Sequence, residues 1–80
     1  MPLEFSAQRF LRFPVQITVN NEARDLPDSA TLADLIRECG LESGPCAAEV
    51  NKSLVPKRQH ADHRLREGDT VELVTLVGGG

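Results

Sequence analysis

The sequence predicts a small α+β domain in which one helix covers a mixed sheet of about five strands. Three observations support this fold class. The chain has only 80 residues, which is enough for one hydrophobic core. Short segments with alternating apolar and polar residues flank one segment with apolar residues at helical spacing. A strand pair, a crossing helix and a last strand that returns beside the first fit this order.

The first predicted strand covers residues 15–19, where Val15, Ile17 and Val19 alternate with polar residues. Asn20 and Asn21 follow, and asparagine tolerates the positive backbone dihedrals of a tight hairpin. We therefore expect residues 22–26 to return as the second strand of a hairpin.

The predicted helix starts at Thr31, whose side chain can cap a free backbone N–H, while Asp34 lies on the favourable side of the helix dipole. Gly40 is expected to end the helix, because glycine readily enters the left-handed conformation that caps a C-terminus. One apolar stripe faces the sheet and consists of Leu32, Leu35, Ile36 and Cys39.

The second half of the chain contains three further predicted strands. Residues 46–50 alternate, with Cys46, Ala48 and Val50 on the apolar face, and a turn at residues 51–52 leads into the short strand 53–55. Polar residues 57–64 are expected to form a loop, anchored by Leu65, and a turn at 67–69 precedes the last strand, residues 70–76.

This order of elements is the β-grasp, or ubiquitin-like, arrangement. It divides the chain into an N-terminal extension (1–13), a β-grasp domain (14–77) and a flexible glycine tail (78–80). The extension contains every aromatic residue of the chain, Phe5, Phe10 and Phe13. It is interpreted either as a frayed terminus or as a segment that covers an apolar surface.

The last strand carries a candidate docking patch. If Val71 and Leu73 face the helix, Val74 and Leu76 point outward beside the tail. Small proteins always expose some apolar side chains, which is the alternative reading. We favour partner docking, because the patch adjoins the segment that a partner would have to recognise.

The tail Gly78, Gly79 and Gly80 is the candidate reactive end. Without side chains, Gly78 and Gly79 can thread a narrow channel and bring the Gly80 carboxylate to a buried site. Because a carboxylate is a poor acyl donor, it needs activation as an acyl phosphate or adenylate before a thiol or persulfide can attack. The alternative is a glycine end without chemistry.

Composition excludes several other classes. Nine Lys and Arg are scattered among twelve Asp and Glu, for a net charge of −3, so the dense basic face that nucleic acid binding requires is absent. No stretch approaches the ~20 apolar residues of a membrane span, and no secretion signal is recognised. We expect a cytoplasmic protein.

The sequence gives little support for independent catalysis or for metal binding by its side chains. Cys39 and Cys46 are expected to be reduced thiols, with Cys39 packed on the apolar stripe. His60 and His63 are spaced like metal ligands, but a closed site needs about four ligands and the cysteines are predicted to face inward. No catalytic triad or carboxylate pair is specified, so we expect a carrier and not an enzyme.

The chain resembles the ThiS family of sulfur carriers of thiamine biosynthesis over about residues 15–80. The matching segments are Ile17-Thr18-Val19-Asn20, Thr31-Leu32, Val50-Asn51, Val55-Pro56, Gln59-His60, Leu65-Arg66-Glu67-Gly68-Asp69 and Val71 to Gly80. Two features depart from the family: residues 1–13 exceed its compact length, and Asn21 stands where a turn glycine is common.

The resemblance implies a reaction cycle carried out by partners. An E1-like adenylyltransferase would use ATP and magnesium to adenylate Gly80, and a cysteine desulfurase or other sulfur donor would convert it to a thiocarboxylate. Thiazole synthase would then take up the sulfur. The chain itself would bind no cofactor.

Three alternatives remain open at this point. A molybdopterin-type sulfur carrier would share the tail chemistry, and a ubiquitin-like modifier would form isopeptide bonds to lysines. A ligand- or RNA-binding β-grasp module would not need the tail at all.

Overall fold

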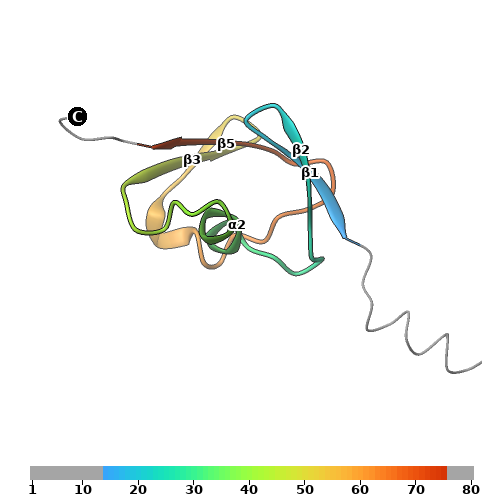
Figure 1. Cartoon of the computed structure of the whole chain (residues 1–80), viewed down its shortest axis with the longest axis horizontal. Coiled ribbons are helices and arrows are strands. Elements are labelled where there is room, and N and C mark those ends of the chain that lie inside the picture. The colour runs from blue at the N-terminus through green and yellow to red at the C-terminus, as the bar shows by residue number, and fades with distance from the viewer. Residues whose placement is uncertain (1–13, 76–80) are drawn as a thin grey trace, which may run out of the picture.

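The computed structural model describes residues 14–75 of the chain. Their elements follow the predicted order, with one short additional helix: β1 (Val15–Val19), β2 (Glu22–Leu26), α2 (Leu32–Glu38), β3 (Cys46–Val50), β4 (Ser53–Val55), the 3₁₀ helix η1 (Lys57–Gln59) and β5 (Thr70–Thr75). The five strands form one sheet in the order β2-β1-β5-β3-β4, and α2 lies against one face (Figure 1). The predicted α+β, β-grasp fold class is confirmed.

The sheet is mixed because β1 and β5 run parallel, whereas the other neighbouring strands are antiparallel. Both hairpins turn through two residues with positive φ. Asn20 and Asn21 have φ of 50° and 72°, and Asn51 and Lys52 have φ of 53° and 73°. Two consecutive positive φ values are the geometry of a tight turn that matches the strand twist, which confirms both predicted turns.

Helix α2 begins and ends as its sequence predicts. Thr31 Oγ1 accepts a hydrogen bond from the Asp34 backbone N–H at 3.2 Å, and Asp34 Oδ2 accepts one from the Thr31 N–H at 3.0 Å. This reciprocal capping box satisfies two donors at the helix start. Gly40 has a φ of +74°, which ends the helix in the left-handed conformation.

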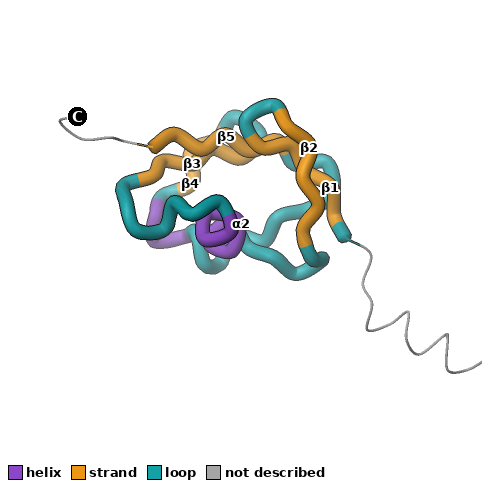
Figure 2. Tube along the Cα trace, viewed as in Figure 1, coloured by secondary structure: helices purple, strands orange, loops and turns teal. Residues whose placement is uncertain are grey.

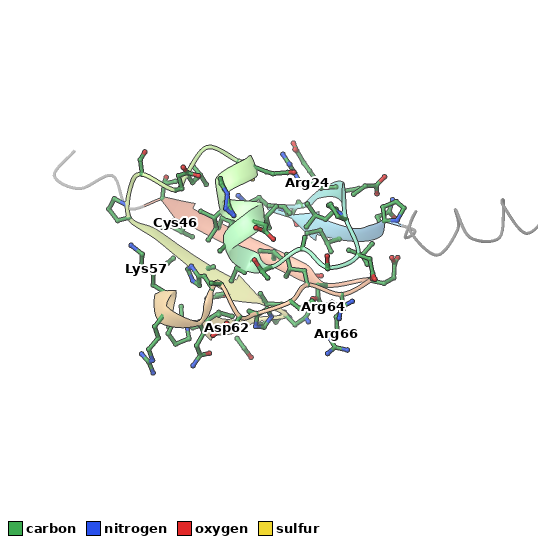
Figure 3. The ribbon with its side chains drawn as sticks, turned by 90° about the horizontal axis from the view of Figure 1, so that it is seen from below. Arg24, Cys46, Lys57, Asp62, Arg64 and Arg66 are labelled. Atoms are coloured by element: carbon green, nitrogen blue, oxygen red, sulfur yellow. The ribbon has the colours of Figure 1, made fainter. Side chains whose placement is uncertain are left out.

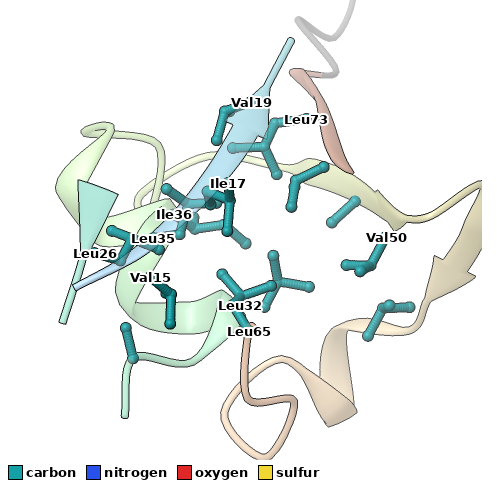
Figure 4. Packing of buried hydrophobic residues seen from close by; sticks show 14 residues of the cluster. Val15, Ile17, Val19, Leu26, Leu32, Leu35, Ile36, Val50, Leu65 and Leu73 are labelled. Carbon is teal, nitrogen blue, oxygen red and sulfur yellow. The ribbon is translucent and has the colours of Figure 1, made fainter. Parts of the chain in front are cut away.

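The core lies between α2 and the sheet, and aliphatic side chains fill it (Figure 4). Leu32, Leu35 and Val71 are completely buried, and Leu65 is only 1% exposed. Leu65 also donates its backbone N–H to the Ala30 carbonyl at 3.0 Å, so the predicted anchor of the long loop is confirmed. The predicted inward residues of β1, β3 and β5 face this core, although Cys46 is only partly buried.

The segment 57–64 is more ordered than the predicted loop. Pro56 has a φ of −60° and its carbonyl accepts the Gln59 N–H at 2.8 Å, which starts η1. His60 follows and is buried, with Nε2 2.9 Å from the Val55 carbonyl oxygen. The prediction of a plain polar loop was wrong here, because a short 3₁₀ turn leaves no hydrophobic periodicity to detect.

Strand β5 is the central strand of the sheet. The last described residue of β5 and the first residue of β1 lie at opposite ends of the molecule (Figure 2). The predicted last strand ran to Leu76, whereas the described strand ends at Thr75 and Leu76 lies outside the described residues. The predicted extension 1–13 and tail 78–80 also lie outside them. Within residues 14–75, no helix has the length and apolar character needed to cross a bilayer.

Candidate functional site

Helix α2 covers one face of the sheet and leaves the opposite face open (Figure 2). Because side chains alternate along a strand, the pairing register assigns each residue to one of these faces. We call the uncovered side the open face. Its strand residues are Gln16, Thr18, Ala23, Asp25, Ala47, Glu49, Leu54, Thr70, Glu72 and Val74.

Two large apolar side chains lie on the open face. Val74 is 55% exposed, in agreement with its predicted outward orientation, and Leu54 is 67% exposed. Val74 stands opposite Ala47 on β3, and Leu54 stands opposite Glu49. Sequence reasoning did not single out Leu54, although its position between Ser53 and the buried Val55 could have indicated it. The docking role of Val74 stays a prediction, as does that of Leu76, which lies outside the described residues.

The charged side chains that the described strands place on the open face are all acidic. Glu49 and Glu72 stand directly opposite each other on β3 and β5, and Asp25 lies on β2. None of the described strand residues on this face is Lys or Arg. Like charges in directly opposite positions weaken a strand pair. This pair therefore makes the face more attractive to a cationic partner without helping the sheet itself.

Several cations of the described part are engaged elsewhere. Figure 3 views the molecule from the helix side and labels Arg24 and Arg64. The ion pairs are Arg24 with Glu38 at 3.3 Å, Arg37 with Asp34 at 2.6 Å and Arg64 with Asp28 at 3.3 Å. Because these side chains are partly or largely accessible to solvent, the pairs contribute little to stability. Within residues 14–75, none of these ion pairs involves Asp25, Glu49 or Glu72 of the open face.

The two cysteines pack beside the core as free thiols, which confirms the predicted packing role of Cys39. Cys46 stands opposite Thr75, at the end of the described β5. Burial, with a smaller contribution from nearby Cys39, raises the pKa of the Cys46 thiol. A raised pKa keeps the thiol protonated and weakly nucleophilic at neutral pH.

His60 is held by the fold itself, since its Nε2 is hydrogen-bonded to the Val55 carbonyl at 2.9 Å. It lines a hollow between α2 and η1 together with Ile36, Arg37 and Lys57. Within residues 14–75, no group of three or more His, Cys, Asp or Glu is placed to hold a metal ion. The glycines predicted to carry the chemistry, Gly78, Gly79 and Gly80, lie outside the described residues.

Comparisons with known proteins give a consistent set of relatives. The Sulfur carrier protein ThiS of Escherichia coli is 27% identical over 66 residues, which cover 82% of this chain and all of the relative. The ThiS of Thermus thermophilus is 34% identical over 64 residues, covering 80% of this chain and 98% of the relative. A Thiazole synthase of Paramagnetospirillum magneticum is 35% identical over 66 residues, but this chain spans only 20% of its length.

A crystal structure of the thiamine biosynthesis protein ThiS from Geobacter metallireducens superimposes with a TM-score of 0.69. The match covers 82% of this chain and all of that one, at 20% sequence identity, and it supports the β-grasp fold alone. The ThiS family model matches residues 14–80, which include the whole described domain and the glycines that follow it. The chain therefore belongs to the ThiS family.

Proposed function

We propose that this chain is a sulfur carrier for thiazole formation in thiamine biosynthesis. The observation that carries this proposal is the family match over residues 14–80, because it joins the β-grasp domain to the glycine end. The two ThiS relatives described above are named as sulfur carriers, which supports the same role. In this role the chain is a co-substrate that its partner enzymes consume and regenerate.

The proposed chemistry takes place at the Gly80 carboxylate. Carboxylate oxygen attacks the α-phosphorus of ATP, pyrophosphate leaves, and an acyl adenylate forms with magnesium as the partner's metal ion. A persulfide of the donor then displaces AMP at the acyl carbon and forms an acyl disulfide. A second thiol of the donor system attacks the donor sulfur of this S–S bond, so the carrier leaves as a thiocarboxylate and the two donor thiols end as a disulfide. Gly78 and Gly79 present no side chain to obstruct a narrow channel in the partner.

The open face is the proposed docking surface for an E1-like adenylyltransferase. Val74 and Leu54 are its exposed apolar groups, and Glu49 and Glu72 supply the negative charge. Leu76 is proposed to extend the apolar surface toward the tail. A partner surface with apolar groups around a Lys or Arg would complement this arrangement and speed association.

The proposed acceptor of the sulfur is thiazole synthase. The similarity of this chain to a fifth of a protein named Thiazole synthase supports a link between the two activities. A cysteine desulfurase or another persulfide donor is the proposed source of sulfur, because the described thiols do not have the properties of a donor. Cys46 has a raised pKa, and both cysteines are partly buried against the core.

The test is formation of thiazole phosphate by the thiazole synthase of the same organism. The reaction contains the full chain, the adenylyltransferase, magnesium, ATP and a sulfur donor. We expect product with the wild-type chain and none with a chain that lacks Gly80, since the reacting carboxylate is then displaced from its site.

A matched control is Gly44→Ala, because a methyl group at Gly44 would meet no atom within 4 Å and its φ lies outside the left-handed region. This variant should support wild-type product formation. Equal product with the chain that lacks Gly80 would overturn the proposal. Sulfur transfer to a molybdopterin synthase large subunit, and not to thiazole synthase, would assign the chain to the other pathway.

A further inference from the structure

Asn20 connects the first hairpin to the end of β5 across 53 positions of sequence. Strand β1 ends at Val19, and the chain then turns away with a φ of 50° at Asn20. The Asn20 backbone N–H still donates to the Val71 carbonyl at 2.9 Å, as a parallel ladder requires. The backbone carbonyl of the same residue would next accept the Leu73 N–H, but the turn redirects it.

The Asn20 side chain takes over this missing connection. Its Oδ1 accepts the Leu73 backbone N–H at 2.9 Å, and its Nδ2 donates to the Leu73 carbonyl at 3.2 Å. The side-chain amide thus acts as one more peptide group of β1. Both hydrogen bonds are partly buried, which makes their replacement by water costly.

We call these two hydrogen bonds between the Asn20 side chain and the Leu73 backbone the clamp. The clamp lies where β5 has few other hydrogen bonds to β1. The parallel ladder pairs only Thr18 with Thr70 and Val19 with Val71. Leu73 is the last buried residue of the strand, and Val74 follows it on the open face. On its other side β5 pairs with β3 from Val71 to Thr75, so without the clamp the end of β5 is held from one side only.

We propose that Asn20 is a positioning residue, which fixes the direction of the end of β5 from the β1 side so that Val74 and the glycine tail reach the activating enzyme together. This inference rests on the proposed carrier function. Loss of the clamp leaves the end of β5 restrained by β3 alone, so its direction varies more, and only part of that range fits the partner. Binding then weakens by the fraction of chains in the competent arrangement, while the bound complex reacts as before.

The second hairpin supplies a matched control at the other end of the same strand. Asn51 has a φ of 53°, and its Oδ1 accepts the Thr70 backbone N–H at 3.0 Å. Its Nδ2 donates to Asp69 Oδ1 at 3.0 Å. Asn51 thus clamps the start of β5, away from the tail. Glycine at either position keeps the turn, because glycine adopts positive φ readily, and removes only the clamp.

The experiment compares Asn20→Gly with Asn51→Gly in the full chain. Amide hydrogen exchange should accelerate at Leu73 in Asn20→Gly and at Thr70 in Asn51→Gly, because each variant frees one of these N–H groups. In adenylation by the cognate activating enzyme, we expect Asn20→Gly to raise KM about tenfold with kcat nearly unchanged, for hydrogen bonds of ordinary strength. Asn51→Gly should leave KM close to the wild-type value.

Each contrary outcome points to a different error. Equal KM values for the two variants, or a fall of kcat alone, would overturn the positioning role while the carrier function stands. Unchanged exchange at Leu73 in Asn20→Gly would show that the clamp does not hold β5. If the wild-type chain itself is not adenylated, the proposed function fails and the positioning role fails with it, whatever the exchange rates are.

Discussion

Single side chains act here mainly by satisfying backbone groups at the ends of elements. Asp34 illustrates this at the start of α2, where its Oδ2 accepts the Thr31 N–H and its Oδ1 lies 2.6 Å from Arg37 Nη2. The backbone hydrogen bond from Thr31, followed by the hydrogen bond from Arg37, lowers the pKa of Asp34 from its ordinary value of 3.8. The ionised carboxylate is therefore the form that the folded state favours.

A pH dependence follows from this lowered pKa. The folded pKa lies below the unfolded one, so the contribution of Asp34 to stability is complete above pH 3.8 and is lost as the pH falls through the folded pKa. Asp34→Asn should lower the melting temperature at neutral pH, and the difference from wild type should shrink below pH 3.8. Thermal unfolding at several pH values measures both quantities.

Asp62→Asn is a suitable control, because Asp62 is exposed and its side chain makes no hydrogen bond within the described residues. It should lower the melting temperature much less than Asp34→Asn does. A difference between Asp34→Asn and wild type that persists unchanged into strong acid would contradict the role given to the capping carboxylate.

Sequence reasoning found the side-chain contacts between residues that are close in the sequence. It missed the contacts between residues that are far apart in the sequence. Thr31 was recognised as a cap because its partner, Asp34, is only three positions away. The clamp by Asn20 was missed, since the pattern that marks Asn20 as a turn residue contains no information about Leu73. The same holds for His60. Its ring is buried and hydrogen-bonded to the Val55 carbonyl only because η1 turns the chain back between these two residues.

Among the secondary-structure elements, the strands were predictable because apolar and polar residues alternate along them. β1 and β5 each place apolar residues toward α2 and polar or exposed ones outward, so their position and orientation could be read from period two. Register across strands could not be read in this way. The opposition of Glu49 and Glu72 becomes visible only once β3 and β5 are aligned.

This pair allows folding and binding to be separated. Glu72→Gln removes a like-charge contact between β3 and β5, so we expect the free energy of unfolding to stay constant or rise by a few tenths of a kcal/mol. The same change should weaken binding to the cognate adenylyltransferase and reduce the salt dependence of binding. Denaturant unfolding and binding titrations at several ionic strengths measure the two effects.

Glu42→Gln provides the same change of charge on the other side of the molecule, where Glu42 borders the hollow beside α2. It should leave binding nearly unchanged. If Glu42→Gln and Glu72→Gln weaken binding equally, net charge and not the open face governs association, and the proposed docking surface would be wrong.

At the scale of the whole molecule, a closed core is combined with a chain end that partners are proposed to handle. The fold class was predictable because the order of elements in 80 residues permits few arrangements. Assignment to the ThiS family also followed from the sequence, through segments spread from Ile17 to Gly80. The choice of acceptor enzyme could not follow from the tail, since the chemistry proposed for it would be the same in a molybdopterin-type carrier.

The most direct measurement of the central claim is the intact mass of the full chain after incubation with the cognate adenylyltransferase, magnesium, ATP and a sulfur donor. We predict a mass increase that corresponds to exchange of one oxygen for sulfur, located at Gly80 by fragmentation and absent when ATP is omitted. An unchanged mass, with an adenylyltransferase that is active on another carrier, would contradict the account.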